Sequence, residues 1–160
     1  MRKVCFVFSL FLGFLFCYSY SFADSLQKAV QKAAHANKVQ AERIKIISEN
    51  MANENSTGML PGQAPYTRQV LFVKNTYDKK HKTNLLKIKK QALDKKSKFK
   101  YRHEPSHPAA DINGFVQYPN VDIEIERIDA ADAQKSYEAN LSVIEVSKAM
   151  IKSTLELMKR

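Results

Sequence analysis

Four histidines and sixteen carboxylate side chains are the residues of this 160-residue chain that could support catalysis or bind a metal. His103 and His107 stand four residues apart, and Asp111 completes a set of ligand types that zinc sites use. Pro105 lies between the two histidines and Pro108 follows them, so they cannot share one face of a helix. Zinc sites need more ligands in firmer geometry. We therefore favour ordinary turn structure here and predict no metal and no cofactor.

The remaining sequence offers no arrangement that is typical of an enzyme. The chain has only four glycines, none of them in a G-x-G phosphate loop, and it lacks a G-x-S-x-G element that would expose a serine nucleophile. Glu124 and Glu126 alternate along a predicted strand over residues 121–126, and the face that they share is expected to be solvated. We predict a protein that is not an enzyme and that has no small-molecule substrate.

The first 23 residues have the pattern of an export signal. Arg2 and Lys3 precede an apolar run over residues 4–16, and small residues stand at Ser21 and Ala23 before the chain becomes polar. This charge, apolar run and cleavage site predict a signal peptide, with an uncleaved signal anchor as the alternative. Both cysteines lie in this segment, so a mature chain from residue 24 would have no disulfide and no thiol ligand.

The positive charge of the chain is concentrated in residues 74–102. This stretch holds 12 Lys/Arg and 2 acidic residues, which accounts for the whole net charge of +10. An exported protein could use it to bind anionic polymers or lipid, which is our alternative function. We favour a solvated, partly mobile insertion, because charge runs usually serve solubility. Nucleic acid is not an expected partner of an exported chain.

Both ends of the chain carry heptad patterns that predict long helices. We expect one helix within residues 24–56, with Ser25 as N-cap, and another from Asp129 through residue 160. Each would be roughly 40 Å long at about 1.5 Å per residue. Their matched lengths favour pairing as an antiparallel coiled coil. The expected seam residues are Leu26, Val30, Ala33, Asn37, Gln40, Ile44, Ile47 and Met51 on the first helix, and Ala130, Gln134, Tyr137, Leu141, Ile144, Lys148, Ile151, Leu155 and Met158 on the last.

Small residues form a second face on each predicted helix, and such faces let further helices approach closely. A solvated face of good helix formers explains the same pattern equally well. The residues concerned are Ala29, Ala33 and Ala36 on the first helix and Ala139, Ser142 and Ser147 on the last.

Residues 57–128 are predicted to form a small β-rich middle domain that contains the basic stretch. Segments 66–73, 99–103, 115–118 and 121–126 have the composition or alternation of strands, and prolines with Asn113-Gly114 mark turns between them. Segment 85–93 fits either a strand or a short basic helix. The predicted fold class is therefore α+β.

Two segments resemble a known family. Residues 48–58 (SENMANENSTG) resemble the N-x-A-N-x-x-T-x-G signature of bacterial flagellar rod and hook proteins. Residues 104–121 (EPSHPAADINGFVQYPNV), followed by SYEAN at 136–140, resemble the flagellar basal-body rod proteins of the FlgC type. Glu104 and Phe115 stand where that family usually has Asp and Tyr. The signal-like segment is a larger departure, because rod proteins normally leave through the flagellar export channel without cleavage.

The resemblance implies a structural subunit of the proximal rod, located in the basal body within the periplasm, which transmits torque from motor to hook. The terminal helices would pack against those of neighbouring rod subunits in a homo- and hetero-oligomeric helical array, with the β-rich middle as the outer layer.

The heptads and the family motifs together nominate the candidate site residues. Those expected in assembly and packing are Leu26, Val30, Ala33, Ile44, Ile47, Asn50, Asn53, Thr57, Gly58, Tyr137, Asn140, Leu141, Ile144, Ile151 and Leu155, and those of the middle-domain motif are Pro105, His107, Pro108, Gly114, Pro119 and Asn120.

Overall fold

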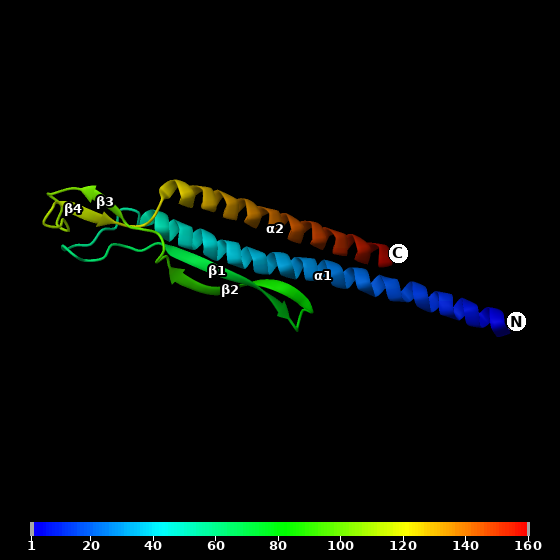
Figure 1. The fold of residues 1–160 in the computed structure, drawn as a ribbon. Helices are drawn as coiled ribbons and strands as arrows, with labels where there is room; N and C mark the ends of the chain where they lie inside the picture. The colour runs from blue at the N-terminus through cyan, green and yellow to red at the C-terminus, as the bar shows by residue number, and fades with distance from the viewer. Residues whose placement is uncertain (1, 160) are drawn as a thin grey trace.

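Two long helices and two β-hairpins make up the fold in the computed structural model, which describes the backbone of residues 2–159 and the side chains of residues 24–159. The elements are α1 (Arg2–Ala52), β1 (Gln69–Asp78), β2 (Thr83–Leu93), β3 (Lys100–His103), β4 (Phe115–Tyr118) and α2 (Ile123–Met158). Figure 1 shows α1 and α2 lying side by side and running in opposite directions, with α1 reaching past the C-terminus. The predicted α+β class with antiparallel terminal helices is confirmed. Their supercoiling stays a prediction.

The helix at the N-terminal end is longer than the sequence suggested. Ser25 was expected to cap it, but α1 continues through this position, so this expectation was wrong. No proline precedes residue 25, and nothing else in the local sequence forces a helix to begin there. The prediction of a signal peptide or anchor falls on residues 1–23, whose side chains lie outside the described part. Within the described residues no helix is long and apolar enough to span a membrane.

The helix at the C-terminal end begins six residues earlier than expected, at Ile123 instead of Asp129. Asp122 is its N-cap, and the Asp122 side chain accepts a hydrogen bond of 3.1 Å from the Glu124 backbone N–H. Glu124 and Glu126 stand in the first turn, where negative charge is favoured by the helix dipole. The strand predicted over residues 121–126 was therefore wrong, and so was the shared solvated face, because Glu124 is exposed whereas Glu126 is buried.

The strands form two separate antiparallel hairpins. In the first, β1 pairs with β2 in a register that shifts between Phe72 and Val73. In the second, β3 pairs with β4. Segment 85–93, which was ambiguous in the sequence, is strand. The strand predicted over residues 66–73 begins at Gln69 and extends to Asp78. Much of the basic stretch 74–102, expected to be a partly mobile insertion, lies in ordered strands.

α1 is covered on two sides, by α2 and by the β1–β2 hairpin, and the core lies between them (Figure 1). Ala33 and Ile47 are buried on the predicted seam of α1, and Val39 and Ile46 are buried on a second face. On the hairpin, Leu85 is fully buried. The remaining buried hydrophobic residues are Val116, Tyr118, Val121 and Ala133.

The face of α2 that meets α1 is rotated relative to the predicted seam. Ala133 and Ser147 are buried instead of their neighbours Gln134 and Lys148, and Leu141 is exposed. Small side chains permit a closer approach of two helices than leucines do. The packed face consequently uses the small residues, and several large apolar side chains of α2 point to solvent.

Candidate functional site

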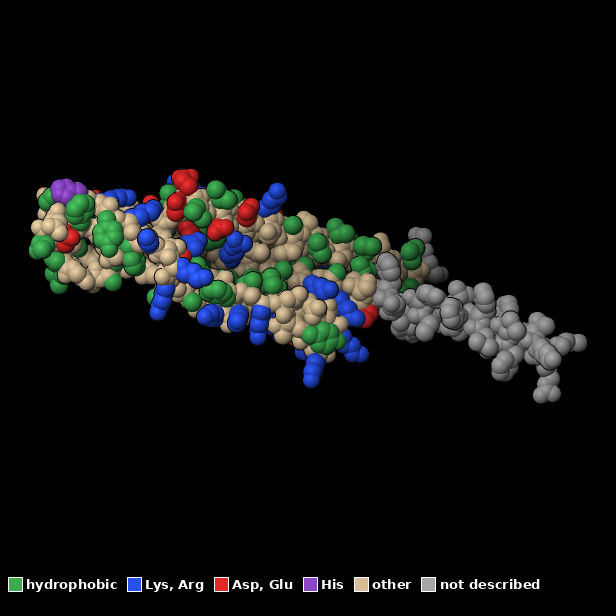
Figure 2. Space-filling model, viewed as in Figure 1, with side chains coloured by type: hydrophobic (Ala, Val, Ile, Leu, Met, Phe, Trp, Pro, Cys, Tyr) green, Lys and Arg blue, Asp and Glu red, His purple; other side chains and the backbone are tan. Residues whose placement is uncertain are grey.

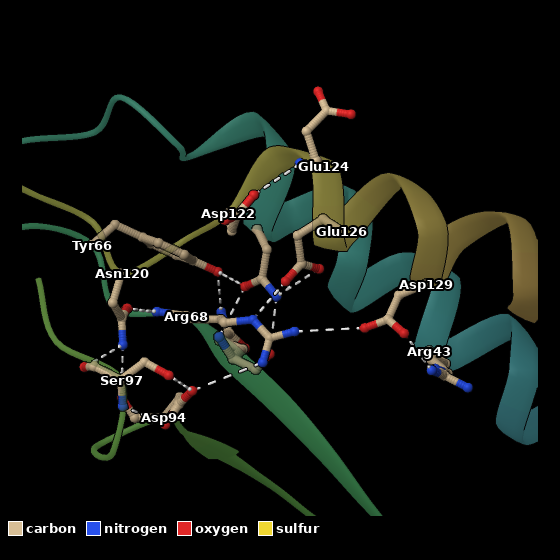
Figure 3. A network of polar contacts seen from close by, with 12 residues as sticks. Arg43, Tyr66, Arg68, Asp94, Ser97, Asn120, Asp122, Glu124, Glu126 and Asp129 are labelled. Carbon is tan, nitrogen blue, oxygen red and sulfur yellow. Dashed lines mark hydrogen bonds and ion pairs between the residues drawn. The ribbon is translucent and has the colours of Figure 1, made fainter. Parts of the chain in front are cut away.

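Arg68, at the base of β1, is the centre of a network of polar contacts that joins α1, the hairpin and α2 (Figure 3). Its Nε donates to Glu126 Oε1 over 2.6 Å. Its terminal nitrogens lie 3.6 Å from Asp129 Oδ2 and 3.8 Å from Asp94 Oδ2. The Glu126 side chain is 0% exposed and that of Arg68 is 21% exposed. Such a buried carboxylate needs its cation, because an unpaired buried charge is strongly unfavourable.

Asn50, near the end of α1, uses all of its hydrogen-bonding capacity in this network. Its Nδ2 donates to the Gln69 backbone oxygen (2.9 Å) and to Glu126 Oε2 (3.3 Å). Its Oδ1 accepts from the Gln69 backbone N–H (2.8 Å) and from the Tyr66 hydroxyl (2.9 Å). Burial raises the pKa of the Tyr66 phenol, so this hydroxyl stays protonated and able to donate. Asn50 therefore connects the end of α1 to the first residues of β1.

Asn120, which precedes α2, makes the corresponding connection from the other side. Its Oδ1 accepts from the Arg68 backbone N–H over 2.8 Å. Its Nδ2 donates to the backbone oxygens of Asp94 (2.9 Å) and Ser97 (3.2 Å). The Ser97 hydroxyl donates to the Asp94 carboxylate, and this bond lowers the pKa of Asp94. Asn120 thus holds both ends of the β1–β2 hairpin against the start of α2.

A second ion pair extends the network along the helices. Arg43 of α1 donates to Asp129 of α2 over 2.9 Å (Figure 3). We refer to the assembly of Arg43, Asn50, Arg68, Asp94, Asn120, Glu126 and Asp129 as the junction. The junction contains no group arranged as a nucleophile with its base. Its charges and amides fix the positions of three elements relative to one another.

The segment after α1 is shaped by a close backbone approach. A Cβ at Gly58 would lie 2.5 Å from the Gln63 backbone oxygen, so only glycine fits there. Asn53 Nδ2 donates to the Glu49 backbone oxygen over 2.8 Å, and Asn53 Oδ1 accepts from the Ser56 hydroxyl over 3.0 Å. Thr57 Oγ1 lies 3.4 Å from His107 Nε2. The motif residues therefore build a turn that contacts the middle domain.

Most of the middle-domain motif lies in the connection between β3 and β4, and its last two residues, Pro119 and Asn120, follow β4. Gly114 has φ +76°, a conformation that favours glycine, and a Cβ there would lie 3.0 Å from Pro105 Cγ. His107 Nδ1 accepts from the Ala109 backbone N–H over 3.1 Å, which is the turn structure that the sequence favoured. Pro119 is fully buried beside Asn120, whereas Pro108 is exposed. Within the described residues no three His, Cys, Asp or Glu side chains are grouped to hold a metal.

The outward face of α2, which we define as Val143, Val146, Met150 and Leu157, is apolar and exposed. These residues are spaced by three, four and seven, so they lie along one side of the helix. The exposed fractions are 45%, 59%, 43% and 72% in that order. Several large apolar side chains exposed along one side of a helix are typical of an interaction surface.

The structure distributes the nominated packing residues over three environments. Ala33, Ile47, Asn50 and Gly58 are buried; Leu26, Val30, Ile44, Asn53, Thr57, Tyr137, Asn140, Ile144 and Ile151 are half-buried; and Leu141 and Leu155 are exposed. Sequence reasoning missed Arg68 and Glu126. A lone arginine in a predicted strand and a glutamate among alternating isoleucines were the available signals, but their pairing spans 58 positions.

Comparison with known proteins gives consistent matches over most of the chain. A family model described as the C-terminal part of the flagellar basal body rod FlgEFG proteins matches residues 112–157. A flagellar basal-body rod protein FlgC of Agrobacterium fabrum is 39% identical over 136 residues, covering 85% of this chain and 97% of that protein. The FlgC protein of Salmonella typhimurium is 32% identical over 125 residues (78% and 92%). That of Borreliella burgdorferi is 33% identical over 150 residues (84% and 98%).

Proposed function

The chain belongs to the FlgC family of flagellar basal-body rod proteins and is a structural subunit of that assembly, and we propose that it transmits torque from motor to hook by packing its terminal helices against those of neighbouring rod subunits. The partners are then other rod subunits and basal-body proteins, in a homo- and hetero-oligomeric helical array. The role is structural, without catalysis. The place of action is the basal body where the rod crosses the periplasm.

The observation that carries this proposal is the outward face of α2. Val143, Val146, Met150 and Leu157 remain exposed although α1 and α2 are already paired. Burying one such side chain fully stabilises by about 1.5–3 kcal/mol, and these are roughly half exposed, so each contributes about 1 kcal/mol on contact with a neighbour. Heterologous contacts between identical chains that do not close into a ring generate helical arrays.

The junction supports the same proposal from the mechanical side. A subunit that transmits torque must keep its helices at a fixed angle to its middle domain. Arg68, Glu126 and Asn50 connect these parts through buried, hydrogen-bonded contacts. Loads applied to the helices would therefore be passed to the hairpin without independent rotation of either part.

The route by which the chain reaches the rod is a separate proposal. The signal-like residues 1–23 favour general secretion with cleavage before residue 24. N-terminal sequencing of the protein from cells tests it, because a chain that still begins at Met1 contradicts cleavage. The relatives, all of them named as rod proteins, give no support to the alternative of binding anionic polymers or lipid.

A matched pair of double variants tests packing through α2. Val146→Lys with Met150→Lys places two lysines on the outward face, whereas Glu145→Lys with Ala149→Lys places two lysines one position back along the helix, at exposed sites that are not part of that face. We expect the first variant to be absent from purified basal bodies and to abolish motility, and the second to be retained. Equal retention of both, or absence of the unaltered chain from basal bodies, would contradict the proposal.

A further inference from the structure

The β1–β2 hairpin carries a strong excess of positive charge on its exposed surface. Residues 69–93 contain seven lysines and one acidic residue, Asp78. Asp78 is already engaged, because Lys87 Nζ lies 3.0 Å from its Oδ2 and His81 Nδ1 lies 3.1 Å from its Oδ1. In the described part of the chain the other lysines of the hairpin form no ion pair, and they are Lys74, Lys79, Lys80, Lys82, Lys89 and Lys90. Figure 2 shows blue side chains along this side of the molecule.

An aromatic side chain is exposed between these lysines. Phe72 is 46% exposed and pairs across the strands with Lys90, and Lys74 lies two residues further along β1 on the same face. Lys90 Nζ lies 5.2 Å from the centre of the Phe72 ring. Surfaces that combine aromatic residues with cations are typical of protein contacts, and they match a partner surface that is acidic and apolar together.

The start of α2 on the same chain offers that chemistry. We define the acidic start of α2 as Asp122, Glu124, Asp132 and Glu138, all of which are exposed. Only Arg127 and Lys135 lie between them as cations, and Arg127 is paired with Glu124 over 3.0 Å. Ile125 (53% exposed) and Ile128 (64%) stand among the acids. Carboxylates gather over this part of the molecule in Figure 2.

We infer that the β1–β2 hairpin of one copy docks on the acidic start of α2 of the next copy, with Lys74, Lys89 and Lys90 facing carboxylates and Phe72 facing the exposed isoleucines. This inference rests on the proposed rod function and names one of its intersubunit contacts. Both surfaces are exposed in one chain, so neither is used by the other there. They differ from each other, so the contact is heterologous and can repeat from copy to copy.

Photo-cross-linking tests which partner lies against the hairpin. A photoreactive amino acid at Lys90 of the full chain, expressed in motile cells, should yield a cross-linked dimer whose joined peptide comes from residues 122–138. The same probe at Lys98, exposed in the loop after the hairpin, serves as the matched control and should not yield that peptide. A cross-link from position 90 to lipid, to another protein or to another segment of this chain would overturn the inference.

Charge exchange tests the electrostatic part with purified full chain. We expect Lys74→Glu with Lys89→Glu and Lys90→Glu to weaken self-association about tenfold or more at low salt, and Lys→Arg at the same positions to preserve it. Neither the Glu variant nor a chain carrying Glu124→Lys, Asp132→Lys and Glu138→Lys should self-associate. Mixing the two should restore association. Failure of the mixed chains to associate would overturn the inference. So would a loss of binding to anionic vesicles by the Glu variant that equals its loss of self-association.

The two proposals fail in distinguishable ways. If the unaltered chain does not purify with basal bodies, the rod function itself is wrong. If it does, and the lysine-reversed chain is incorporated equally well and cross-links elsewhere, only the hairpin contact is wrong. Reassociation of the two reversed chains in solution, with cross-linking to residues 122–138, supports the contact independently of motility.

Discussion

Glu126→Gln is the substitution that tests the role of the junction most directly. Both carboxylate oxygens of Glu126 accept hydrogen bonds, Oε1 from Arg68 Nε and Oε2 from Asn50 Nδ2. Glutamine has one oxygen, so in either orientation of its amide one of these donors faces an N–H group instead. The variant has nearly the same shape, and the change is confined to charge and hydrogen bonding.

The expected loss of stability follows from burial. Removing one partner of a buried ion pair destabilises a protein by about 3–5 kcal/mol. In the variant Arg68 would still have Asp129 and Asp94 as ion-pair partners, at longer distances. The expected loss of stability is therefore at the lower end of this range, about 3 kcal/mol. Glu124→Gln is the matched control, two residues earlier and exposed, with an expected loss below about 1 kcal/mol. A further variant, Arg68→Met with Glu126→Leu, should recover part of the loss, because a buried pair can be replaced by apolar side chains.

Urea unfolding of the full chain, followed by far-ultraviolet circular dichroism, measures these differences. Amide hydrogen exchange shows where in the chain the stability is lost. The Gln69 backbone N–H is protected by its bond to Asn50, and the Arg68 backbone N–H by its bond to Asn120. We expect Glu126→Gln to lower the unfolding midpoint and to raise exchange at both amides. Identical midpoints for Glu126→Gln and Glu124→Gln would refute the reasoning that the junction holds the three elements together.

Two further predictions concern local geometry and pH. Gly58→Ala places a Cβ 2.5 Å from the Gln63 backbone oxygen and should lower the free energy of unfolding by about 1–3 kcal/mol. An unchanged thermal unfolding midpoint would contradict this, because it would mean that the turn backbone shifts without loss of stability. The hydrogen bond from Lys87 lowers the pKa of Asp78 to about 2, so the stabilisation at the hairpin tip is complete above the ordinary pKa of 3.8 and is lost as the pH falls through about 2. Nuclear magnetic resonance titration should show Lys87→Gln shifting the Asp78 midpoint upward, and an unmoved midpoint would contradict that cause.

Heptad spacing was sufficient to predict that both ends of the chain are helical, because this pattern depends on local sequence. Their antiparallel pairing was inferred from matched predicted lengths, although α1 has 51 residues and α2 has 36. The strand predicted at residues 121–126 failed because alternation of isoleucine and glutamate suits a strand only where a partner strand exists. Here Asp122 caps a helix and Ile123 continues into it. The burial of Glu126 could not be predicted from its neighbours, since it depends on Arg68 in another element.

The rotation of α2 has the same origin. Local pattern ranks Leu141 above Ala133 as a packing residue, yet the contact with α1 selects the residue that permits close approach. Which of two possible faces a helix buries is decided by its neighbours, and here Leu141 is left exposed while Ala133 is buried.

The distribution of satisfied and unsatisfied groups indicates how the subunit is completed. At the junction, the amides of Asn50 and Asn120 have partners for their donors and acceptors. Farther along α1, Asn37 Oδ1 and Gln40 Oε1 are buried without a hydrogen-bond partner in the described part of the chain, and each such group is unfavourable by about 1–3 kcal/mol. The outward face of α2 is also exposed, along the paired helices. The junction is therefore already complete within a single chain, whereas the paired helices beyond it leave these two polar atoms and the outward face uncovered in the described part of the chain.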